Sequence, residues 1–255
     1  MSSRMEGYSV VSCHEQGYST ILWDVDGTLL DFLYSQRYAI KKCFKTAGLE
    51  ITEEQMNRYS RINDDYWKRL ELGEVTKEEL LTGRFVALFC EYGISGIDLE
   101  SFCREYQEAL GSVFSFIDDA LEICKVLRGQ FKQYVITNGV SSTQRSKLKL
   151  SGLDEVMDGI FISEEIGYPK PQKEFFAYCL ERIPDKDRSK ILVVGDSLTS
   201  DIKGGIQMGI PTCWYRPDGR ENDTPWKPDH EISDLHMIYD ILGVCEAWQN
   251  QQDKN

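Results

Sequence analysis

Acidic residues follow two short apolar runs of the sequence, and their spacing indicates carboxylate chemistry. Asp24 and Asp26 come directly after the run 20–23, and Asp196 comes shortly after the run 190–194. A carboxylate can attack phosphorus and form an acyl-phosphate that water then hydrolyses. A second carboxyl two residues further on can protonate the leaving group and later deprotonate the water. The sequence therefore predicts that Asp24 is a nucleophile and that Asp26 is a general acid and base.

A phosphate dianion placed among Asp24, Asp26 and Asp196 would be strongly repelled unless a cation lies nearby. Magnesium suits oxygen ligands and bridges carboxylates to a substrate phosphate. We therefore predict Mg2+ as the cofactor. The formal net charge of −13 does not exclude binding of a small anion, because a metal ion or a local lysine can reverse the potential at one spot.

These acids can act together only if the runs before them are strands of one sheet. The β-favouring apolar runs are residues 20–23, 133–136, 159–162, 190–194 and 211–215. They alternate with helical stretches, which is typical of a parallel sheet covered on both faces. Ligands of such sheets sit beyond the carboxyl ends of the strands. Asp24, Thr137 and Asp196 are therefore expected to meet in one crevice.

Residues 32–116 show helical spacing without a convincing strand, which predicts an inserted helical unit. Thr52 fits the N-cap position of one helix, and Thr76 with Glu79 forms a capping box at the start of another. The predicted fold class is α/β, with a Rossmann-like parallel sheet core and an inserted all-helical cap. The predicted division of the chain is an N-terminal extension 1–17, a core 18–31 and 117–255, and a cap 32–116.

Composition limits the partners of the chain. A charge of −13 opposes binding to nucleic acid polymers and to anionic membranes, because both depend on clustered Lys and Arg. The eight cysteines contain no Cys-x-x-Cys pair, so we expect reduced thiols. No apolar stretch reaches the length of about 20 residues that spans a bilayer. A cytoplasmic location is therefore expected, while the oligomeric state stays open.

Four motifs in order resemble those of the haloacid dehalogenase superfamily, and the resemblance extends from about Ser19 over nearly the whole chain. The motifs are Asp24-Val-Asp-Gly-Thr28, Thr137, Lys170 and Gly195-Asp-Ser-Leu-Thr-Ser-Asp201. The resemblance implies the core fold of that superfamily, with a helical cap inserted after the first motif. It also implies a phosphatase or phosphomutase, because Asp26 stands where true dehalogenases and transport ATPases lack an aspartate. Hydrolysis is the simpler of the two reactions.

The resemblance also implies the metal ligands. They would be the side chain of Asp24, the backbone carbonyl of Asp26 and the side chain of Asp196. Asp201 would orient a metal-bound water. From the residues alone, we expect Gly27 to relieve a Cβ conflict in the turn and Thr28 to bond to the turn backbone.

Binding of the phosphoryl group is likewise implied by the resemblance. Lys170, which lies between two prolines, would supply the remaining positive charge. It would act both in catalysis and in binding of the substrate. Thr137 with the following backbone amide, that of Asn138, would hold phosphoryl oxygens in the transition state.

A closer resemblance is to phosphatases of pyrimidine nucleoside 5′-monophosphates, which implies a nucleotide as the small phosphorylated partner. It is carried by Asn63-Asp-Asp-Tyr-Trp67, Thr76 through Arg84-Phe85, Thr137-Asn-Gly-Val140, Glu181-Arg-Ile-Pro184 and Gly195 through Gly205. The sequence departs from the usual pattern at Trp23 and Gly27. Cap aromatics such as Tyr66, Trp67 and Phe85 can either contact a base or pack within the cap.

Two other functions stay open at this point. One is a sugar-phosphate or small-acid phosphatase, such as one for phosphoglycolate, which would use the same chemistry. The other is a binding protein that keeps the fold without catalysis. The chain has neither a Gly-x-x-x-x-Gly-Lys phosphate loop nor a Gly-x-Gly-x-x-Gly fingerprint, which removes the main support for kinase and dinucleotide functions.

Overall fold

The computed structural model describes residues 17–244. The predicted N-terminal extension, apart from Gly17, therefore lies outside the described residues. Within them, six strands form one sheet in the order β3-β2-β1-β4-β5-β6, and every neighbouring pair is parallel. The strands are β1 (Thr20–Trp23), β2 (Lys132–Thr137), β3 (Gly159–Ile162), β4 (Ile191–Gly195), β5 (Thr212–Tyr215) and β6 (His230–Ile232). The prediction of an α/β fold with a parallel sheet is confirmed.

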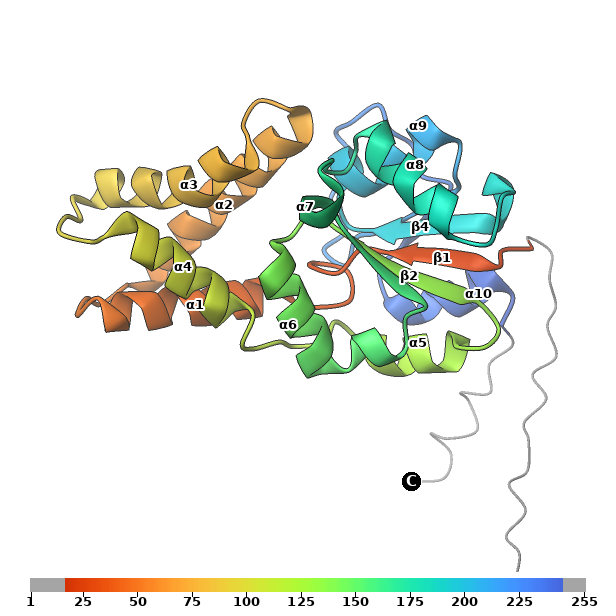
Figure 1. Cartoon of the computed structure of the whole chain (residues 1–255), viewed down its shortest axis with the longest axis horizontal. Helices are drawn as coiled ribbons and strands as arrows, with labels where there is room; N and C mark the ends of the chain where they lie inside the picture. Colours follow the sequence, from red (N-terminus) through yellow and green to blue (C-terminus); the bar gives the residue numbers. More distant parts are fainter. Residues whose placement is uncertain (1–16, 245–255) are drawn as a thin grey trace, which may run out of the picture.

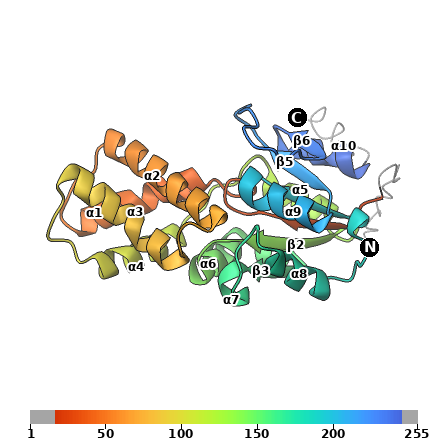
Figure 2. The same ribbon diagram turned by 90° about the horizontal axis from the view of Figure 1, so that it is seen from above.

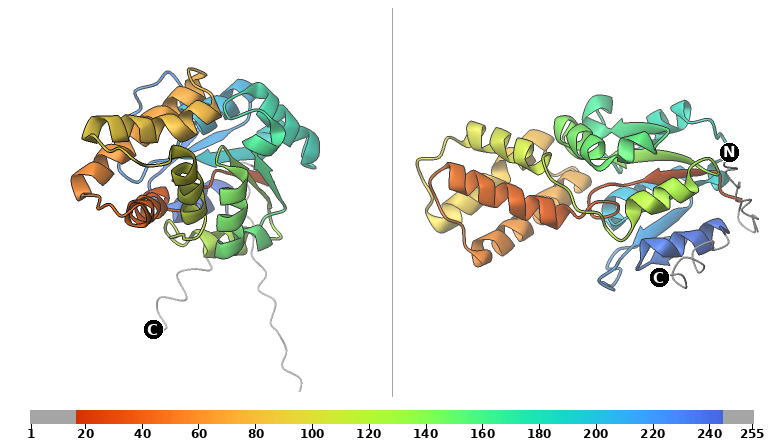
Figure 3. Two further views of the ribbon diagram at one scale, coloured as in Figure 1. Left: turned by 60° about the vertical axis from the view of Figure 1, so that its left-hand side comes forward. Right: turned by 90° about the horizontal axis from the view of Figure 1, so that it is seen from below.

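The strands are almost continuously apolar because both faces of the sheet are covered. In β1, Ile21 and Trp23 face one hydrophobic cluster and Leu22 faces another. Figures 1 and 3 show helices on both sides of the sheet. The helices of the first face are α5 (Ala120–Leu127), α6 (Ser141–Ser151) and α10 (Ile238–Leu242). Those of the second face are α8 (Lys173–Arg182) and α9 (Lys203–Met208).

Short turns complete the core. They are η1 (Leu153–Glu155), α7 (Ser163–Ile166), η2 (Arg188–Lys190), the π-helical turn η3 (Leu198–Ile202) and η4 (Leu235–Met237). The strand β6 was not predicted from the sequence. It has three residues, only Ile232 of which is buried, so it carries no apolar run. Its pairing with β5 makes it an edge strand.

Helices are the only regular elements between residues 32 and 110. They are α1 (Phe32–Thr46), α2 (Glu53–Leu72), α3 (Lys77–Tyr92) and α4 (Leu99–Leu110). Thr52 and Thr76 are N-caps, and each forms a capping box with the residue three positions on. The four helices share their own cluster of buried side chains, separate from the clusters of the sheet. Figure 2 shows them as a layer beside the carboxyl ends of the strands, and we call them the cap.

The chain passes between the sheet and the cap twice, and the two passages are bound to each other. Asp31 N donates to Ser115 O at 2.9 Å, and Ile117 N donates to Leu29 O at 3.0 Å. These bonds flank a bridge between Leu30 and Phe116. The predicted boundaries between core and cap, at residues 31 and 117, both lie in this paired segment. The division of the chain into these units remains a prediction.

Two expectations from composition can be compared with the described residues. The cysteines at positions 43, 90, 103, 124, 179 and 213 are free thiols, whereas Cys13 and Cys245 lie outside the described part. Among helices between residues 17 and 244, none combines the length and apolar character needed to cross a bilayer.

Candidate active site

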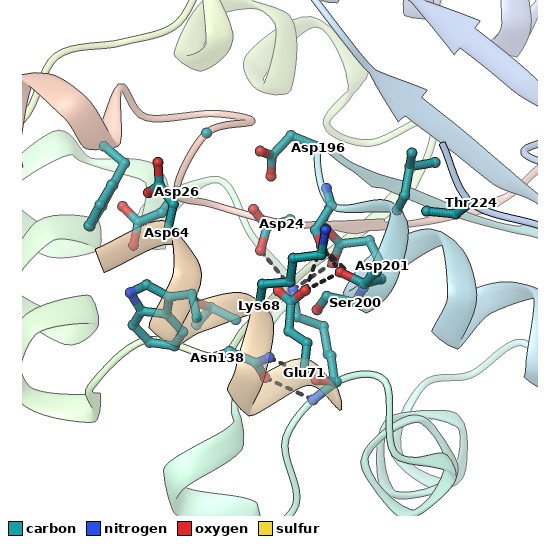
Figure 4. A pocket seen from close by; sticks show the side chains of 18 of the residues that line it. Asp24, Asp26, Asp64, Lys68, Glu71, Asn138, Asp196, Ser200, Asp201 and Thr224 are labelled. Carbon is teal, nitrogen blue, oxygen red and sulfur yellow. Dashed lines mark hydrogen bonds and ion pairs between the residues drawn. The ribbon is translucent and has the colours of Figure 1, made fainter. Parts of the chain in front are cut away.

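Polar residues at the carboxyl ends of β1, β2 and β4 line one pocket. Asp24, Thr137 and Asp196 border it together with Lys170, and its volume is about 440 Å³. Cap helix α2 forms the opposite wall (Figure 4). The convergence expected from the parallel sheet is therefore present, and the volume lies within the range of roughly 300–1,000 Å³ that is usual for small-molecule sites.

Two glycines let the acidic side chains approach one another. Gly27 has φ of +92°, and a Cβ there would lie 2.8 Å from an oxygen of Asp196. A Cβ on Gly195 would lie 2.3 Å from the carboxyl carbon of Asp201. No side chain fits at either position without displacing a carboxylate, so the glycines of both motifs are required by the site itself.

Lys170 is the cationic centre of the site. Its side chain is buried, and Nζ lies 2.7 Å from Asp24 Oδ1 and 2.7 Å from Asp201 Oδ1. Nζ also donates to Ile136 O at 2.9 Å. Burial by itself would lower the pKa of Lys170, but the carboxylates of Asp201 and Asp24 outweigh it and hold the pKa above its ordinary value. The ammonium group therefore stays charged.

The side chain of Asn138 holds the backbone of Lys170 in place. Its Nδ2 donates to Lys170 O at 2.9 Å, and its Oδ1 accepts from Lys170 N at 2.8 Å. The Asn138 side chain is thus occupied with positioning Lys170. Binding of phosphate by the backbone amide of Asn138 and by Thr137 remains a prediction.

Three carboxylates form a compact cluster beside Lys170. One oxygen each of Asp24, Asp196 and Asp201 lies within 4.8 Å of the others. Burial raises the pKa of Asp24 well above its usual range, although Lys170 opposes the rise. Burial, with the neighbouring Asp201, raises the pKa of Asp196 to about 7. Burial is the largest cause of both shifts, and Lys170 and Arg220, whose guanidinium lies 3.6 Å from Asp196 Oδ2, offset it only in part.

The cluster fits a divalent cation. All its donors are carboxylate oxygens, which magnesium prefers, and their mutual distances allow one ion to contact several of them. The cluster includes the side chains of Asp24 and Asp196, the two that were predicted to bind Mg2+, together with Asp201. Figure 4 shows Asp26 to the left of this group, so its side chain is not part of the cluster.

Addition of Mg2+ is expected to stabilise the folded protein. At a concentration of 100 times Kd, binding should raise the free energy of unfolding by about 2.7 kcal/mol. The variant Asp196→Asn should lose most of this increase, whereas Asp65→Asn, on an exposed part of α2, should keep it. Thermal melts with and without Mg2+ measure the difference. Equal stabilisation of Asp196→Asn and the wild type would contradict the site.

Thr28 differs from its expected role. Its hydroxyl donates to Asp24 Oδ2 at 3.3 Å rather than to the turn backbone. The predicted nucleophile is therefore held at both oxygens, by Lys170 on one and by Thr28 on the other. This pair of contacts fixes the direction of the carboxylate toward the pocket.

The cap contacts the core at the edge of the pocket. Glu71 of α2 accepts hydrogen bonds from Ser197 Oγ, at 3.1 Å, and from Thr199 Oγ1. Lys77 Nζ, at the start of α3, donates to Asn138 O. The Glu71 contacts hold α2 against the π-helical turn η3, and the Lys77 contact joins α3 to the loop that follows β2.

The Glu71 contact is expected to depend on pH. Burial raises the pKa of Glu71 from 4.5 to about 7, so its contribution to stability is fully present below pH 4.5 and is lost as pH rises through about 7. Glu71→Gln cannot ionise. In chelator-treated protein it should exceed the wild type in free energy of unfolding by up to about 3 kcal/mol at pH 8 and match it at pH 4.

Urea unfolding at the two pH values measures this difference. Glu50→Gln is the matched control, because Glu50 is exposed and no shift is expected there. A Glu71→Gln variant that is less stable than the wild type at pH 8 would show that the charged carboxylate favours the contact.

The cap aromatics divide between the two roles considered for them. Trp67 lines the pocket, with Lys77 Nζ 5.2 Å from the centre of its ring. Phe85 is fully buried in the cap and stacks on Tyr59 at a centroid distance of 5.3 Å. Tyr66 packs against Gly83 and Arg69 rather than lining the pocket. Of the three, only Trp67 is placed to contact a substrate.

Four residues of the site were missed from the sequence: Glu71, Gln144, Lys147 and Arg220. Glu71 stands four positions after Trp67 on α2, and helical spacing alone would have placed both on one face. Gln144 and Lys147, whose side chains contact the Asp26 carboxylate, share the buried face of α6 with Leu148, which the same periodicity could have revealed. Arg220 lies in a loop, where the sequence holds no periodic signal.

Comparison with known proteins gives a consistent result. The family described as haloacid dehalogenase-like hydrolase matches residues 18–209. The HAD-hydrolase YfnB of Bacillus subtilis is 40% identical over 229 residues, covering 89% of this chain and 96% of YfnB. A crystal structure described as YfnB bound to magnesium superposes with a TM-score of 0.85 at 39% identity, covering 89% of this chain and 99% of that one.

Two further relatives have a named substrate class. Pyrimidine 5'-nucleotidase PynA of Streptococcus pneumoniae is 33% identical, over 88% of this chain and 95% of its own. Pyrimidine 5'-nucleotidase YjjG of Escherichia coli is 32% identical, over 87% of this chain and 96% of its own. The similarity to nucleotidases noted in the sequence is confirmed by these relatives.

Proposed function

We propose that this chain, which belongs to the haloacid dehalogenase-like hydrolases, is a magnesium-dependent phosphatase that forms an aspartyl-phosphate on Asp24. The observation that carries the proposal is the cluster of three carboxylates around Lys170 at the ends of the strands. A carboxylate held at both oxygens beside a buried ammonium group is prepared to attack phosphorus.

In the first step an Asp24 oxygen forms a bond to phosphorus as the bond to the leaving oxygen breaks. Asp26, in its protonated form, gives its proton to that oxygen, so the product leaves as an alcohol. Lys170, Thr137 and the backbone amide of Asn138 hold the phosphoryl oxygens. The phosphoryl group is then an acyl-phosphate on Asp24.

In the second step water attacks the same phosphorus, and the Asp26 carboxylate takes a proton from it. The bond between phosphorus and Asp24 breaks, which releases inorganic phosphate and restores the Asp24 carboxylate. Mg2+, held by the side chains of Asp24 and Asp196 and the backbone carbonyl of Asp26, would neutralise negative charge around the phosphoryl group. Asp201 would orient a water molecule at that ion.

The substrate class we propose is pyrimidine nucleoside 5′-monophosphates. The names of the relatives PynA and YjjG support it. The lining of the pocket suits a single phosphate better than several, since Asp64, Glu221 and Asp223 add negative charge to that of the cluster and outnumber the further cations Lys68 and Arg220. Trp67 offers an aromatic surface to a base.

A phosphate-release screen tests the proposal. The protein is incubated with Mg2+ and equal concentrations of UMP, CMP, dTMP, AMP, GMP, ribose 5-phosphate and phosphoglycolate. Pyrimidine nucleotides are expected to give the highest kcat/KM. Faster turnover of the sugar phosphate or phosphoglycolate would favour a metabolite phosphatase of the same chemistry. Absence of phosphate release from every compound would favour a binding protein without catalysis.

A further inference from the structure

Two buried side chains of α6 hold the carboxylate of Asp26. Lys147 Nζ lies 2.5 Å from Asp26 Oδ1, and Gln144 Nε2 lies 2.5 Å from Asp26 Oδ2. Each oxygen of the carboxylate therefore has its own donor. Neither donor belongs to the motifs that identify the family. We propose that Lys147 and Gln144 are positioning residues that set the orientation of Asp26 for proton transfer, an inference that rests on the proposed phosphatase function.

The burial of Lys147 is the first support. Its side chain has 0% exposure, and Asp26 is the only acid with which it forms an ion pair in the part of the chain that the structure describes. Its ammonium group also lies 5.7 Å from the centre of the Phe32 ring. A fully buried ammonium group is costly to desolvate unless its partner is well placed. The chain therefore carries an ammonium group at a position where an apolar residue would pack without that cost.

The path of Gln144 is the second support. This residue is also buried, and its amide reaches Asp26 across Gly139. A Cβ on Gly139 would lie 2.2 Å from Gln144 Nε2, so any side chain at that position would block the contact. Glycine at position 139 is therefore needed for this contact. It leaves room for the amide that bonds to Asp26.

Two donors at different oxygens fix the orientation of the Asp26 carboxylate, which one donor cannot do. An aspartate side chain has two rotatable bonds, and a single contact leaves rotation of the carboxylate free. With Lys147 on Oδ1 and Gln144 on Oδ2, both rotations are restrained. Proton transfer requires the donor oxygen within hydrogen-bond reach of the leaving oxygen, so this restraint bears directly on the rate of that step.

The same helix contacts the end of the cap. Thr143 Oγ1 donates to Gln107 O at 3.1 Å, and Ser146 Oγ donates to Gly111 O at 2.8 Å. These residues immediately precede Gln144 and Lys147 in the chain. The position of Asp26 is therefore tied through α6 to the end of α4, close to where the cap joins the core. A loss of activity after substitution of Lys147 must accordingly be assigned either to Asp26 or to a displaced cap.

Dependence on the leaving group makes that separation. A nucleoside leaves as an alkoxide, which needs a proton, whereas p-nitrophenolate is a far weaker base and leaves without one. Lys147→Met should lower kcat/KM on UMP about 10²- to 10³-fold, in the range that loss of acid–base catalysis produces. It should lower kcat/KM on p-nitrophenyl phosphate less than about 10-fold, because kcat/KM reports the reaction only up to departure of the leaving group and excludes the later hydrolysis, which needs Asp26 for both substrates.

Matched variants complete the experiment. Lys149→Met changes an exposed lysine of the same helix, and Ser146→Ala removes a contact with the cap end. Both should keep the wild-type ratio of the two kcat/KM values. Gln144→Met should change the ratio in the same direction as Lys147→Met. Added to Asp26→Asn, Lys147→Met should lower kcat/KM on UMP no further, because both act through one group.

Several outcomes would overturn the inference. Equal losses on both substrates would assign Lys147 a structural role, and so would a further loss on top of Asp26→Asn. If Lys147→Met does not fold, Lys147→Arg carries the same comparison, since it keeps the charge but changes the geometry of the contact. A wild-type protein that hydrolyses neither substrate would instead overturn the proposed function. Leaving-group dependence in Asp26→Asn but not in the Lys147 variants would overturn the positioning role alone.

Discussion

Replacement of Asp24 by asparagine is expected to reduce phosphate release by about 10⁴-fold or more, the scale seen when an enzyme loses its nucleophile. Asparagine has nearly the same shape as aspartate but lacks the anionic oxygen that attacks phosphorus. The side-chain oxygen that remains can still accept from Lys170 or from Thr28, which contact opposite oxygens of Asp24. The fold should therefore be retained while the chemistry is lost.

The measurement has two parts. Steady-state phosphate release from UMP gives the loss in kcat, and circular dichroism shows whether the variant is folded. Substrate that is radiolabelled in its phosphate should leave label on the acid-quenched wild type and none on Asp24→Asn. Asp65→Asn, which changes an exposed aspartate of the cap, serves as the control and should behave as the wild type. Substantial turnover by Asp24→Asn would rule out the covalent mechanism.

Replacement of Lys170 by methionine is expected to impair both activity and stability. Its ammonium group lies 2.7 Å from Asp24 Oδ1 and 2.7 Å from Asp201 Oδ1, and all three side chains are buried. Loss of one partner from a buried ion pair typically costs about 3–5 kcal/mol, because a charge remains without compensation. Loss of one electrostatic contact to the phosphoryl group should lower kcat about 10²- to 10³-fold.

Urea unfolding and phosphate release measure the two effects. Lys173→Met is the matched control, because Lys173 is an exposed lysine three positions further along the chain, at the start of α8. It should retain wild-type stability and kcat. A Lys170→Met variant as stable and as active as this control would mean that the acidic cluster does not require the lysine.

The sequence alone predicted the fold class and the meeting of the motifs because these depend on local patterns. Apolar runs that alternate with helical stretches indicate a parallel sheet, and a parallel sheet brings the carboxyl ends of its strands to one edge. Asp24 and Asp196 could therefore be placed together although 171 positions separate them. The edge strand β6 escaped prediction because it has too few apolar residues to form a pattern.

The requirement for glycine in the first turn was also predictable, but its full reason was not. Positive φ is a local property that the motif suggests. The approach of Asp196 Oδ2 to within 2.8 Å of the position of a Cβ on Gly27 is a long-range contact that only the folded chain reveals. The partner of Thr28 was predicted wrongly for the same reason, since its hydroxyl bonds to Asp24 rather than to the turn.

Residue types and their order thus determined the sheet, the helical insert and the set of acids and lysine at the site. The tertiary structure decided which side chains orient that set. Lys147 and Gln144 reach Asp26 from a helix more than a hundred positions away, and Glu71 reaches Thr199 from the cap. Such contacts depend on how helices pack against the sheet. Packing is a property of the whole chain, and no short stretch of sequence encodes it.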